Sequence, residues 1–437
     1  MRIKARPDEF MVRELSSWTP SPKGPISVYS LRKKKLDTFS AVRRLASASQ
    51  VPLDAIHYVG LKDRQAVTTQ LISVSGGHRL NPDQRMPGLS LRYLGRSPEP
   101  VTAAALEGNA FRIVVRDLGR AEVERLERNL PAVQAHGLIN YFDDQRFGSL
   151  TAGQGMPGRA LAKGDPEQAL KDLLASPGRR DPPQEKRFKT LVRRTWGDWQ
   201  TLARKWGTRR GKTMVTHLAR KPGDFAGAWQ RCPARERAIH VFAYQSLIWN
   251  ESVRRYLDAT LPADHRFATS YAGGKHVWPD YAVDETPPPL PETFPLIDHT
   301  SEFSDPAVRE AVEGALRAED LTVPTFKING IRGCFFKHEE RPLFVHPGGV
   351  ELLHGPAPDD MHPGRLRATL EFALPPGAYA TLLLKRLFGV GIEQGRDREP
   401  EDRRGKGRGQ GRGKGRSKGQ GRGGKRQGRG QRGRGSR

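Results

Sequence analysis

The stretch 59-VGLKDRQAVTTQ-70 contains two runs of strand character separated by a short polar turn. The flanking segments, 55-AIHYVGL-61 and 66-AVTTQLISVS-75, are rich in β-branched and apolar residues that favour strands. Gly60 lies at the bend and Asp63 lies at the tip, between Lys62 and Arg64. An Asp at a turn usually hydrogen-bonds to its own backbone. The spacing alone therefore leaves open whether Asp63 shapes the turn or takes part in chemistry.

The rest of the first 150 residues continues this mixture of strands and helices. The pattern predicts further strands at 10-FMVREL-15 and 110-AFRIVVRDL-118, and helices at 37-DTFSAVRRLASAS-49 and 119-GRAEVERLERNL-130. Asp37 is a suitable N-cap for the first helix. The strands outnumber the helices and alternate in polarity, which is typical of an antiparallel or mixed sheet with helices on one face. We therefore expect an α+β fold.

The composition changes after residue 150. Gly, Pro and basic residues dominate the segment from 150 to 237, where the helical patterns are short. A longer helix is predicted over 237–257, with Ile239, Phe242, Ser246, Trp249 and Val253 recurring at three- and four-residue steps. The Pro-rich stretch 284–295 must be an extended loop. Strand patterns return at 341–347 and 366–377, followed by a predicted helix over 378–388.

The charge of the chain indicates an anionic partner. Its 437 residues include 74 Lys and Arg and 48 Asp and Glu, a net charge of +26. Fifteen of these charges lie in 403–437, which contains no acidic residue, so residues 1–402 still carry +11. Nucleic acid is the favoured partner and an anionic membrane surface is the competing one. The Gly-, Arg- and Lys-rich segment 393–437 has too few apolar residues to fold and is predicted to be a disordered basic tail.

Several other classes of protein are disfavoured. No apolar run approaches the roughly 18 residues of a membrane span, and the N-terminus lacks the apolar stretch of a signal peptide, so we expect a cytoplasmic protein. Cys232 and Cys334 are too few for a disulfide scaffold and too far apart in sequence for a metal-ligand pair. The twelve His residues form no His-Glu-x-x-His motif, and we expect no metal.

Five stretches stand out, in this order along the chain: 3-IKARPDEFMVRE-14, 60-GLKDRQAVTTQ-70, 106-LEGNAFRIVVRD-117, 140-NYFDDQRFG-148 and 374-LPPGAYATLLLKRL-387. They resemble the motifs of the TruD-type tRNA pseudouridine synthases, and 243-AYQSLIWN-250 is a weaker match. The resemblance implies conversion of a uridine in tRNA to pseudouridine without a cofactor, at position 13 in the D arm. It also implies a pseudouridine-synthase catalytic domain with a mixed or antiparallel sheet.

The resemblance assigns roles to particular residues. Asp63 matches the catalytic Asp, which must be ionised when the base arrives, and Lys4 matches the N-terminal Lys that would keep it charged. Lys62 and Arg64 are alternative sources of that positive charge, or contacts for phosphates. The target base must leave its stack, and Phe142 occupies the family's aromatic position, where a ring could stack on the base. Asn140 is the polar neighbour that could hold the loop or a base edge.

Two further features concern the substrate side of the site. Glu14 matches a family Glu, although a solvent-facing strand residue would look the same. Asp143 replaces the family's Gly after Phe142 and Asp144 follows it, so that two negative charges lie beside an RNA-binding loop. An Asp can adopt positive φ at modest cost if the position requires it, and we expect Arg146 to pair with one of the two. We interpret 374–387 as structural, a turn and helix that close the catalytic fold.

These assignments predict how the chain is divided. Residues 1–152 and 338–392 would form the catalytic domain, residues 153–337 an inserted second α+β domain, and 393–437 the tail, with RNA in a basic cleft between the two domains. We expect a monomer that binds tRNA, no membrane and no small-molecule cofactor. The alternative is a non-catalytic RNA-binding or RNA-chaperone protein on a synthase fold, suggested by the long tail and by Asp143.

Deletion of residues 403–437 is predicted to weaken RNA binding and to reduce its dependence on salt. A plot of log affinity against log salt concentration has a negative slope, and each phosphate contact that is lost makes it less steep by roughly 0.7 to 0.9. Titrations of full-length and shortened protein with tRNA at several salt concentrations measure this. An unchanged slope would show that the tail does not contact RNA.

Overall fold

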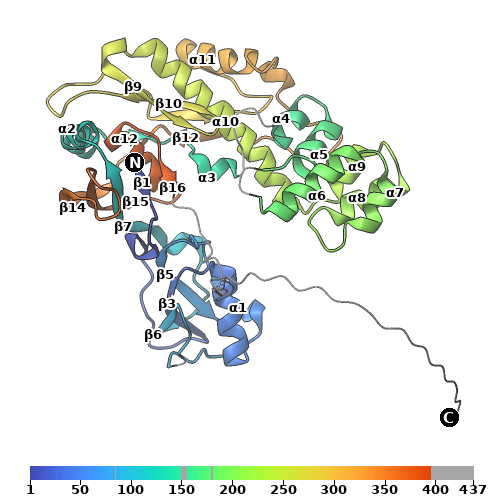
Figure 1. Ribbon diagram of the computed structural model, residues 1–437, viewed down its shortest axis with the longest axis horizontal. Helices are drawn as coiled ribbons and strands as arrows, with labels where there is room; N and C mark the ends of the chain where they lie inside the picture. Colours follow the sequence, from blue (N-terminus) through green and yellow to red (C-terminus); the bar gives the residue numbers. More distant parts are fainter. Residues whose placement is uncertain (84, 149–154, 179–180, 395–437) are drawn as a thin grey trace, which may run out of the picture. The chain divides into compact units, whose positions relative to one another are not determined.

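The computed structural model describes residues 1–83, 85–148, 155–178 and 181–394 (Figure 1). Within these residues the main feature is a ten-stranded mixed sheet whose central path runs β14-β15-β7-β2-β5-β3-β6. Its strands are β14 (Gly348–Pro358), β15 (Leu366–Leu374), β7 (Leu106–Leu118), β2 (Phe10–Ser16), β5 (Val67–Val74), β3 (Ile26–Lys34) and β6 (Leu89–Ser97), with β1 (Arg2–Ile3), β4 (Ile56–Tyr58) and β16 (Glu393–Gln394) attached. The predicted strands near 10, 56, 67, 110 and 366 are confirmed.

The two ends of the chain meet in this sheet. β2 pairs with β7 and β7 pairs with β15, so that Phe111 lies in register with both Val12 and Phe372. The Phe111 and Phe372 rings stack with centroids 5.3 Å apart. β2 and β5 are parallel, whereas the other neighbours along the central path are antiparallel, which confirms the predicted mixed sheet. Segments more than 350 residues apart in sequence are therefore held in one layer.

Helices cover the apolar surfaces of the sheet. In α1 (Thr38–Ser49) Ala41, Val42 and Leu45 are buried in one cluster with side chains of β3 and β5. The Asp37 side chain accepts a hydrogen bond from the Ser40 amide at 2.8 Å, which confirms the predicted N-cap and lowers the pKa of Asp37. α2 (Arg120–His136) packs against α12 (Ala380–Phe388), where Asn129 donates hydrogen bonds to two carbonyls of the last turn.

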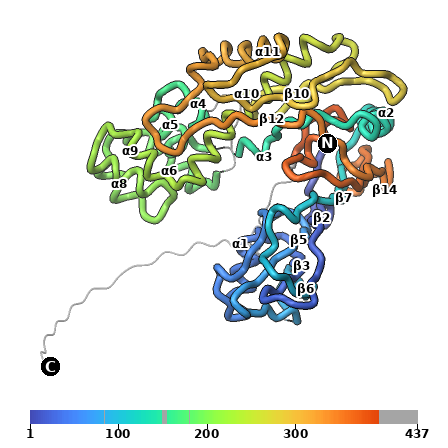
Figure 2. Tube along the Cα trace, turned by 180° about the vertical axis from the view of Figure 1, so that it is seen from behind, coloured from blue at the N-terminus to red at the C-terminus, as the bar shows by residue number. Residues whose placement is uncertain are grey.

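The middle of the chain is organised around one long helix, α10 (Ala234–Thr260). Ser246, Trp249 and Val253 are buried as the periodicity predicts, whereas Ile239 is 51% exposed. Figure 2 shows α5, α6, α8 and α9 gathered together, and α11 lies along α10. The helices here are α3 (Asp144–Phe147), α4 (Pro157–Ala162), α5 (Pro166–Leu174), α6 (Pro183–Arg194), α7 (Trp199–Lys205), α8 (Lys212–Arg220), α9 (Phe225–Gln230) and α11 (Pro306–Arg317).

Three short antiparallel pairs complete the described part of the chain, namely β9 (Arg266–Tyr271) with β10 (Gly274–Pro279), β11 (Thr293–Leu296) with β12 (Glu339–Pro342), and β8 (Leu138–Ile139) with β13 (Phe344–Val345). The Pro-rich stretch is irregular up to β11. Of the predicted tail, Glu393 and Gln394 pair with β1, and residues 395–437 lie outside the described residues. No described helix has both the length and the apolar character needed to cross a membrane.

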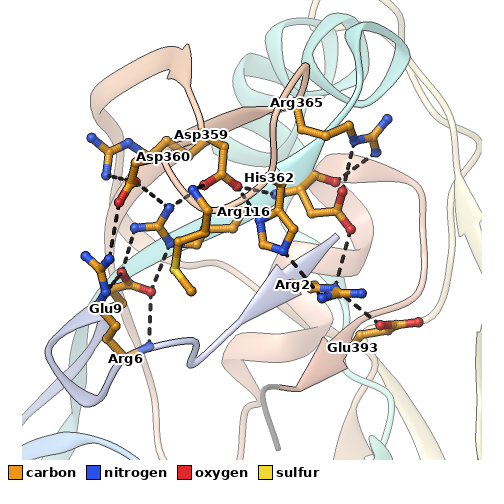
Figure 3. A network of polar contacts seen from close by, with 12 residues as sticks. Arg2, Arg6, Glu9, Arg116, Asp359, Asp360, His362, Arg365 and Glu393 are labelled. Atoms are coloured by element: carbon orange, nitrogen blue, oxygen red, sulfur yellow. Dashed lines mark hydrogen bonds and ion pairs between the residues drawn. The ribbon is translucent and has the colours of Figure 1, made fainter.

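A buried arginine fixes the N-terminal segment (Figure 3). Arg116 of β7 is 1% exposed and binds Glu9 through two hydrogen bonds, from Nε at 3.1 Å and from Nη2 at 2.7 Å. Its Nη1 contacts Asp359 and Asp360, in the loop after β14. Hydrogen bonds from Arg116, His362 and backbone amides hold the pKa of Asp359 well below its usual range, although burial opposes this. The network ties segment 2–9 to the centre of the sheet.

Arg116→Met is predicted to lower the free energy of unfolding by about 3–5 kcal/mol, because it leaves the Glu9 and Asp359 carboxylates buried without their cation. Arg112→Met is the matched control on the same strand. Arg112 and Glu371 are both largely exposed, so their ion pair contributes only about 0–1 kcal/mol. Urea unfolding of the two variants measures the difference, and equal losses would contradict the role given to Arg116.

Candidate active site

The turn that carries Asp63 is fixed by hydrogen bonds from three directions. Gln70 Nε2 of β5 donates to the Gly60 carbonyl at 3.1 Å, and the Lys62 amide donates to Thr38 Oγ1 of α1 at 3.0 Å. Lys33 Nζ of β3 donates to the carbonyls of Lys62 and Asp63 at 3.0 and 2.9 Å. A turn that lacks regular secondary structure is thereby held rigidly against β3, β5 and α1.

The Asp63 side chain points at Lys4. Lys4 Nζ lies 2.7 Å from Asp63 Oδ2, and it also lies 4.2 Å above the centre of the Phe10 ring. The Lys4 side chain is 9% exposed and that of Asp63 is 35% exposed, so the cation is enclosed while the carboxylate can still be reached. Lys4 has φ of +58°, a conformation that side-chain-bearing residues rarely adopt. The Arg116 network on one side and β1 on the other support this conformation.

Lys62 and Glu14 are joined to each other rather than directed at Asp63. Lys62 Nζ lies 2.9 Å from Glu14 Oε2 and donates to Asn109 Oδ1 at 2.8 Å. The Glu14 side chain is only 2% exposed, so it lies beneath the surface of the site. Arg64, in contrast, is exposed and does not line the cavity described next. Of the three cations considered from the sequence, Lys4 is the one in contact with the Asp63 side chain.

A cavity of about 480 Å³ opens beside Asp63. This volume is in the range of pockets that hold small organic ligands. The described residues that line it include Lys4, Phe10, Leu61, Lys62, Asp63, Asn109, Phe111, Asp143, Asp144, Gln145, Arg146, Ile239, Tyr379, Thr381 and Lys385. The exposure of Ile239 follows from its position here. The walls come from β2, the Asp63 turn, β7, the 140–148 loop, α10 and the start of α12.

Both acidic residues of the 140–148 loop contact the same cation, Lys385. Its Nζ lies 2.5 Å from Asp143 Oδ1 and 3.1 Å from Asp144 Oδ2, and Asp143 also accepts a hydrogen bond from Thr381. Asp143 and Lys385 are each 1% exposed. The expected pairing with Arg146 is wrong, because Lys385 occupies that position and Arg146 Nε donates to Ser246 at 3.0 Å. Asp143 has extended geometry, φ −109°, so no positive φ is required.

Asn140 and Phe142 lie beside this cavity without lining it. Asn140 Oδ1 and its carbonyl both accept hydrogen bonds from Arg341, and its amide group donates to the Pro342 carbonyl. Phe142 is 6% exposed, its ring packs edge-on against Trp249, and the Arg341 guanidinium lies 4.1 Å from the ring centre. Burial lowers the pKa of Arg341 to about 10, which leaves it charged at neutral pH. The predicted residues therefore form two neighbouring groups, one around Asp63 and one around Phe142.

Some residues of the site were not singled out from the sequence. These residues lie in two of the family-like stretches: Asn109 in 106–117, and Tyr379, Thr381 and Lys385 in 374–387. The sequence assigns no role to Asn109 and predicts only a structural role for 374–387. Burial raises the pKa of Tyr379, whose neighbours include Arg146 and Arg341. Lys33 lies in a run of basic residues that gives no sign of burial.

The arrangement is suited to nucleophilic or electrostatic catalysis by a carboxylate. Asp63 is half-enclosed, ion-paired and at the edge of a cavity, which are features of a carboxylate that can attack a bound ligand or stabilise positive charge on it. Among the described residues, no group of three or more His, Cys, Asp or Glu side chains could hold a metal ion.

Comparison with known proteins gives consistent matches. The family model described as tRNA pseudouridine synthase D (TruD) matches residues 1–274 and 289–387. The tRNA pseudouridine synthase D of Aquifex aeolicus is 30% identical, over 89% of this chain and 98% of its own length. That of Leptospira interrogans is 28% identical, over 88% and 95%. A crystal structure assigned to the TruD type, from Methanosarcina mazei, aligns with a TM-score of 0.67 and 25% identity, over 89% of this chain and 94% of that one.

Lys385→Met is predicted to lower the free energy of unfolding by about 3–5 kcal/mol, because Asp143 would remain buried without a cation. Adding Asp143→Asn should recover part of this loss, since the double variant leaves no uncompensated buried charge; Asp144 is 37% exposed and can be hydrated. Chemical denaturation of both variants tests the pairing. A double variant that is less stable than Lys385→Met would contradict it.

Proposed function

The chain belongs to the TruD family of tRNA pseudouridine synthases, and from that membership we propose that it isomerises uridine 13 in the D arm of tRNA to pseudouridine, with Asp63 as the nucleophile and no cofactor. The observation that supports this best is the Asp63 carboxylate, ion-paired with Lys4 at 2.7 Å at the edge of a cavity of about 480 Å³. Uridine and pseudouridine are isomers, so the reaction adds no atom and no electron. A carboxylate and a shaped cavity are sufficient for it in principle.

In the proposed reaction the bond between N1 of the base and C1′ of the ribose breaks, the base turns, and a bond from C5 to C1′ forms. The proton on C5 is lost and N1 gains one, so the atoms balance. Asp63 attacks the reacting nucleotide or stabilises it while the base is detached. A base entering the cavity removes water from the carboxylate, which would disfavour its charge. The Lys4 ammonium offsets this cost, and being 9% exposed it is screened little by solvent.

The remaining residues have proposed roles around this centre. Lys62 and Glu14 hold each other and the turn, while Arg146 at the cavity and Arg64 on the surface contact RNA phosphates or base edges. Phe142 is the candidate aromatic face for the flipped base, where stacking contributes roughly 1–3 kcal/mol. For this role the Arg341 guanidinium, now 4.1 Å from the ring, must give way to the base. Asn140 holds Arg341 and so sets the position of that guanidinium.

The proposal extends to where and how the protein acts. We propose that the protein acts on tRNA in the cytoplasm as a monomer, and all the residues proposed to take part in the reaction belong to one chain. The basic tail supplies contacts with RNA that do not depend on sequence. The negative charge of Asp143 beside an RNA-binding loop was one motive for considering a purely RNA-binding protein. The ion pair of Asp143 with Lys385 weakens that motive.

Asp63→Asn is predicted to abolish pseudouridine formation, with a rate at least about a thousandfold lower, while tRNA binding changes little. The amide keeps the size of the side chain but cannot act as a nucleophile. Single-turnover assays on unmodified tRNA, with binding measured on the same preparations, test this. Asp54→Asn, at an exposed position in the same domain, is the control and should behave as wild type.

Normal conversion by Asp63→Asn would show that another group is the nucleophile. If neither the wild type nor the variant converted uridine, while both bound tRNA, the protein would be an RNA-binding protein on a synthase fold. Mapping of the modified position in tRNA separately tests the assignment to position 13.

A further inference from the structure

Lys33 is a fully buried lysine that has no carboxylate within ion-pair distance among the residues that the structure describes. It lies on β3 next to the Asp63 turn and is 0% exposed. Its Nζ donates three hydrogen bonds, all to backbone carbonyls: Leu36 at 2.8 Å, Lys62 at 3.0 Å and Asp63 at 2.9 Å. An ammonium group has three N–H donors, and all three are used here. The turn is thus attached to β3 through one side chain.

Burying this charge is costly, and an apolar side chain at the same place would avoid the cost. The partly buried carbonyls of Lys62 and Asp63 would then lose this donor, and the turn forms no ladder with β3 that could replace it. The charged groups that face Lys33 are Asp63 and Lys62 of the turn and Asp37 at the start of α1. The two carboxylates stabilise its charge and Lys62 opposes it. Lys33 therefore links the catalytic turn, β3 and α1 both by hydrogen bonds and by charge.

We propose that Lys33 is a positioning residue for the isomerisation, a proposal that rests on the proposed function of Asp63. Lys33 holds the backbone of Lys62 and Asp63 so that the Asp63 carboxylate meets both Lys4 and the bound nucleotide. Lys33 does not touch the substrate, and it is absent from the residues that line the cavity. Its effect passes through the position of the turn. A displacement of about 1 Å at a reacting group can reduce the rate by roughly a hundredfold.

The charge on Lys33 also makes the site sensitive to pH. Burial lowers the pKa of Lys33 from 10.5 to about 8, with the charges of Asp63 and Asp37 opposing the shift. Below that pH the ammonium carries three donors, and above it the neutral amine carries only two. As the pH rises through about 8, one of the three carbonyls therefore loses its donor and the positive charge facing Asp63 disappears. The turn is held most firmly on the acid side of this value.

The test compares Lys33→Met with Lys34→Met, the adjacent residue on β3. Lys34 is largely exposed and pairs with Asp8 on the surface, so its loss should have little effect. Lys33→Met should lower kcat by roughly tenfold to a hundredfold with little change in KM. Amide hydrogen exchange should become faster in residues 60–64 and stay unchanged in β5. The fall in wild-type kcat above pH 8 should be absent from the variant.

Lys33→Gln is a second variant, for use if Lys33→Met folds poorly, because its side chain retains N–H donors without the charge. Lys33→Gln should also lack the fall in kcat near pH 8. Unchanged exchange in residues 60–64 together with normal kcat in either variant would overturn the proposal. So would faster exchange with normal kcat, because the position of the turn would then be irrelevant to the rate. These outcomes differ from failure of the proposed function, which Asp63→Asn reports independently.

Discussion

The contact between Lys4 and Asp63 depends on two buried cations that do not touch each other, Arg116 and Lys33. Lys4 lies in a short segment with an unfavourable positive φ, and Asp63 lies in a turn without regular secondary structure. Neither backbone would keep its position alone, because strained or irregular segments persist only when their surroundings fix them. Arg116 fixes the first through Glu9, and Lys33 fixes the second through its carbonyls. The ion pair at the cavity is the result of both.

The order of the strands explains why the site needs both ends of the chain. β7 lies between β2, which follows Lys4, and β15, which leads to α12. α12 brings Lys385 to the 140–148 loop, and β2 brings Lys4 to the Asp63 turn. The walls of the cavity come from six separate segments, among them β2 and β7, so the cavity is formed only when the sheet is complete. The site therefore forms only when the ten-stranded sheet folds, and no isolated segment of the chain contains it.

The sequence predicted the elements of the fold better than the contacts of the site. The strands at β2, β5, β7 and β15 alternate in polarity or are rich in β-branched residues, so their patterns are visible. β3 is buried on both faces from Ile26 to Tyr29, which removes the alternation, and it was not among the strands named. Asp63 and Lys4 were found through motifs. The partner of Asp143 could not be predicted, because Lys385 lies on α12, 242 residues further along the chain, and no local pattern encodes how that helix approaches the loop.

The pairing of charges around the cavity bears on how RNA would bind. Each carboxylate of the turn and the loop contacts a lysine: Asp63 is paired with Lys4, Glu14 with Lys62, and Asp143 and Asp144 share Lys385. Arg146 and Arg341 are different, since neither has a carboxylate within ion-pair distance among the described residues, and both lie near the Phe142 ring. In the proposed reaction an anionic nucleotide would meet carboxylates that each contact a lysine, together with Arg146, which lines the cavity, whereas Arg341 is held by Asn140 beside the Phe142 ring. Under the proposed function, Asp143 can lie beside the substrate because it is ion-paired with Lys385, and Arg146 and Arg341 supply positive charge near the Phe142 ring.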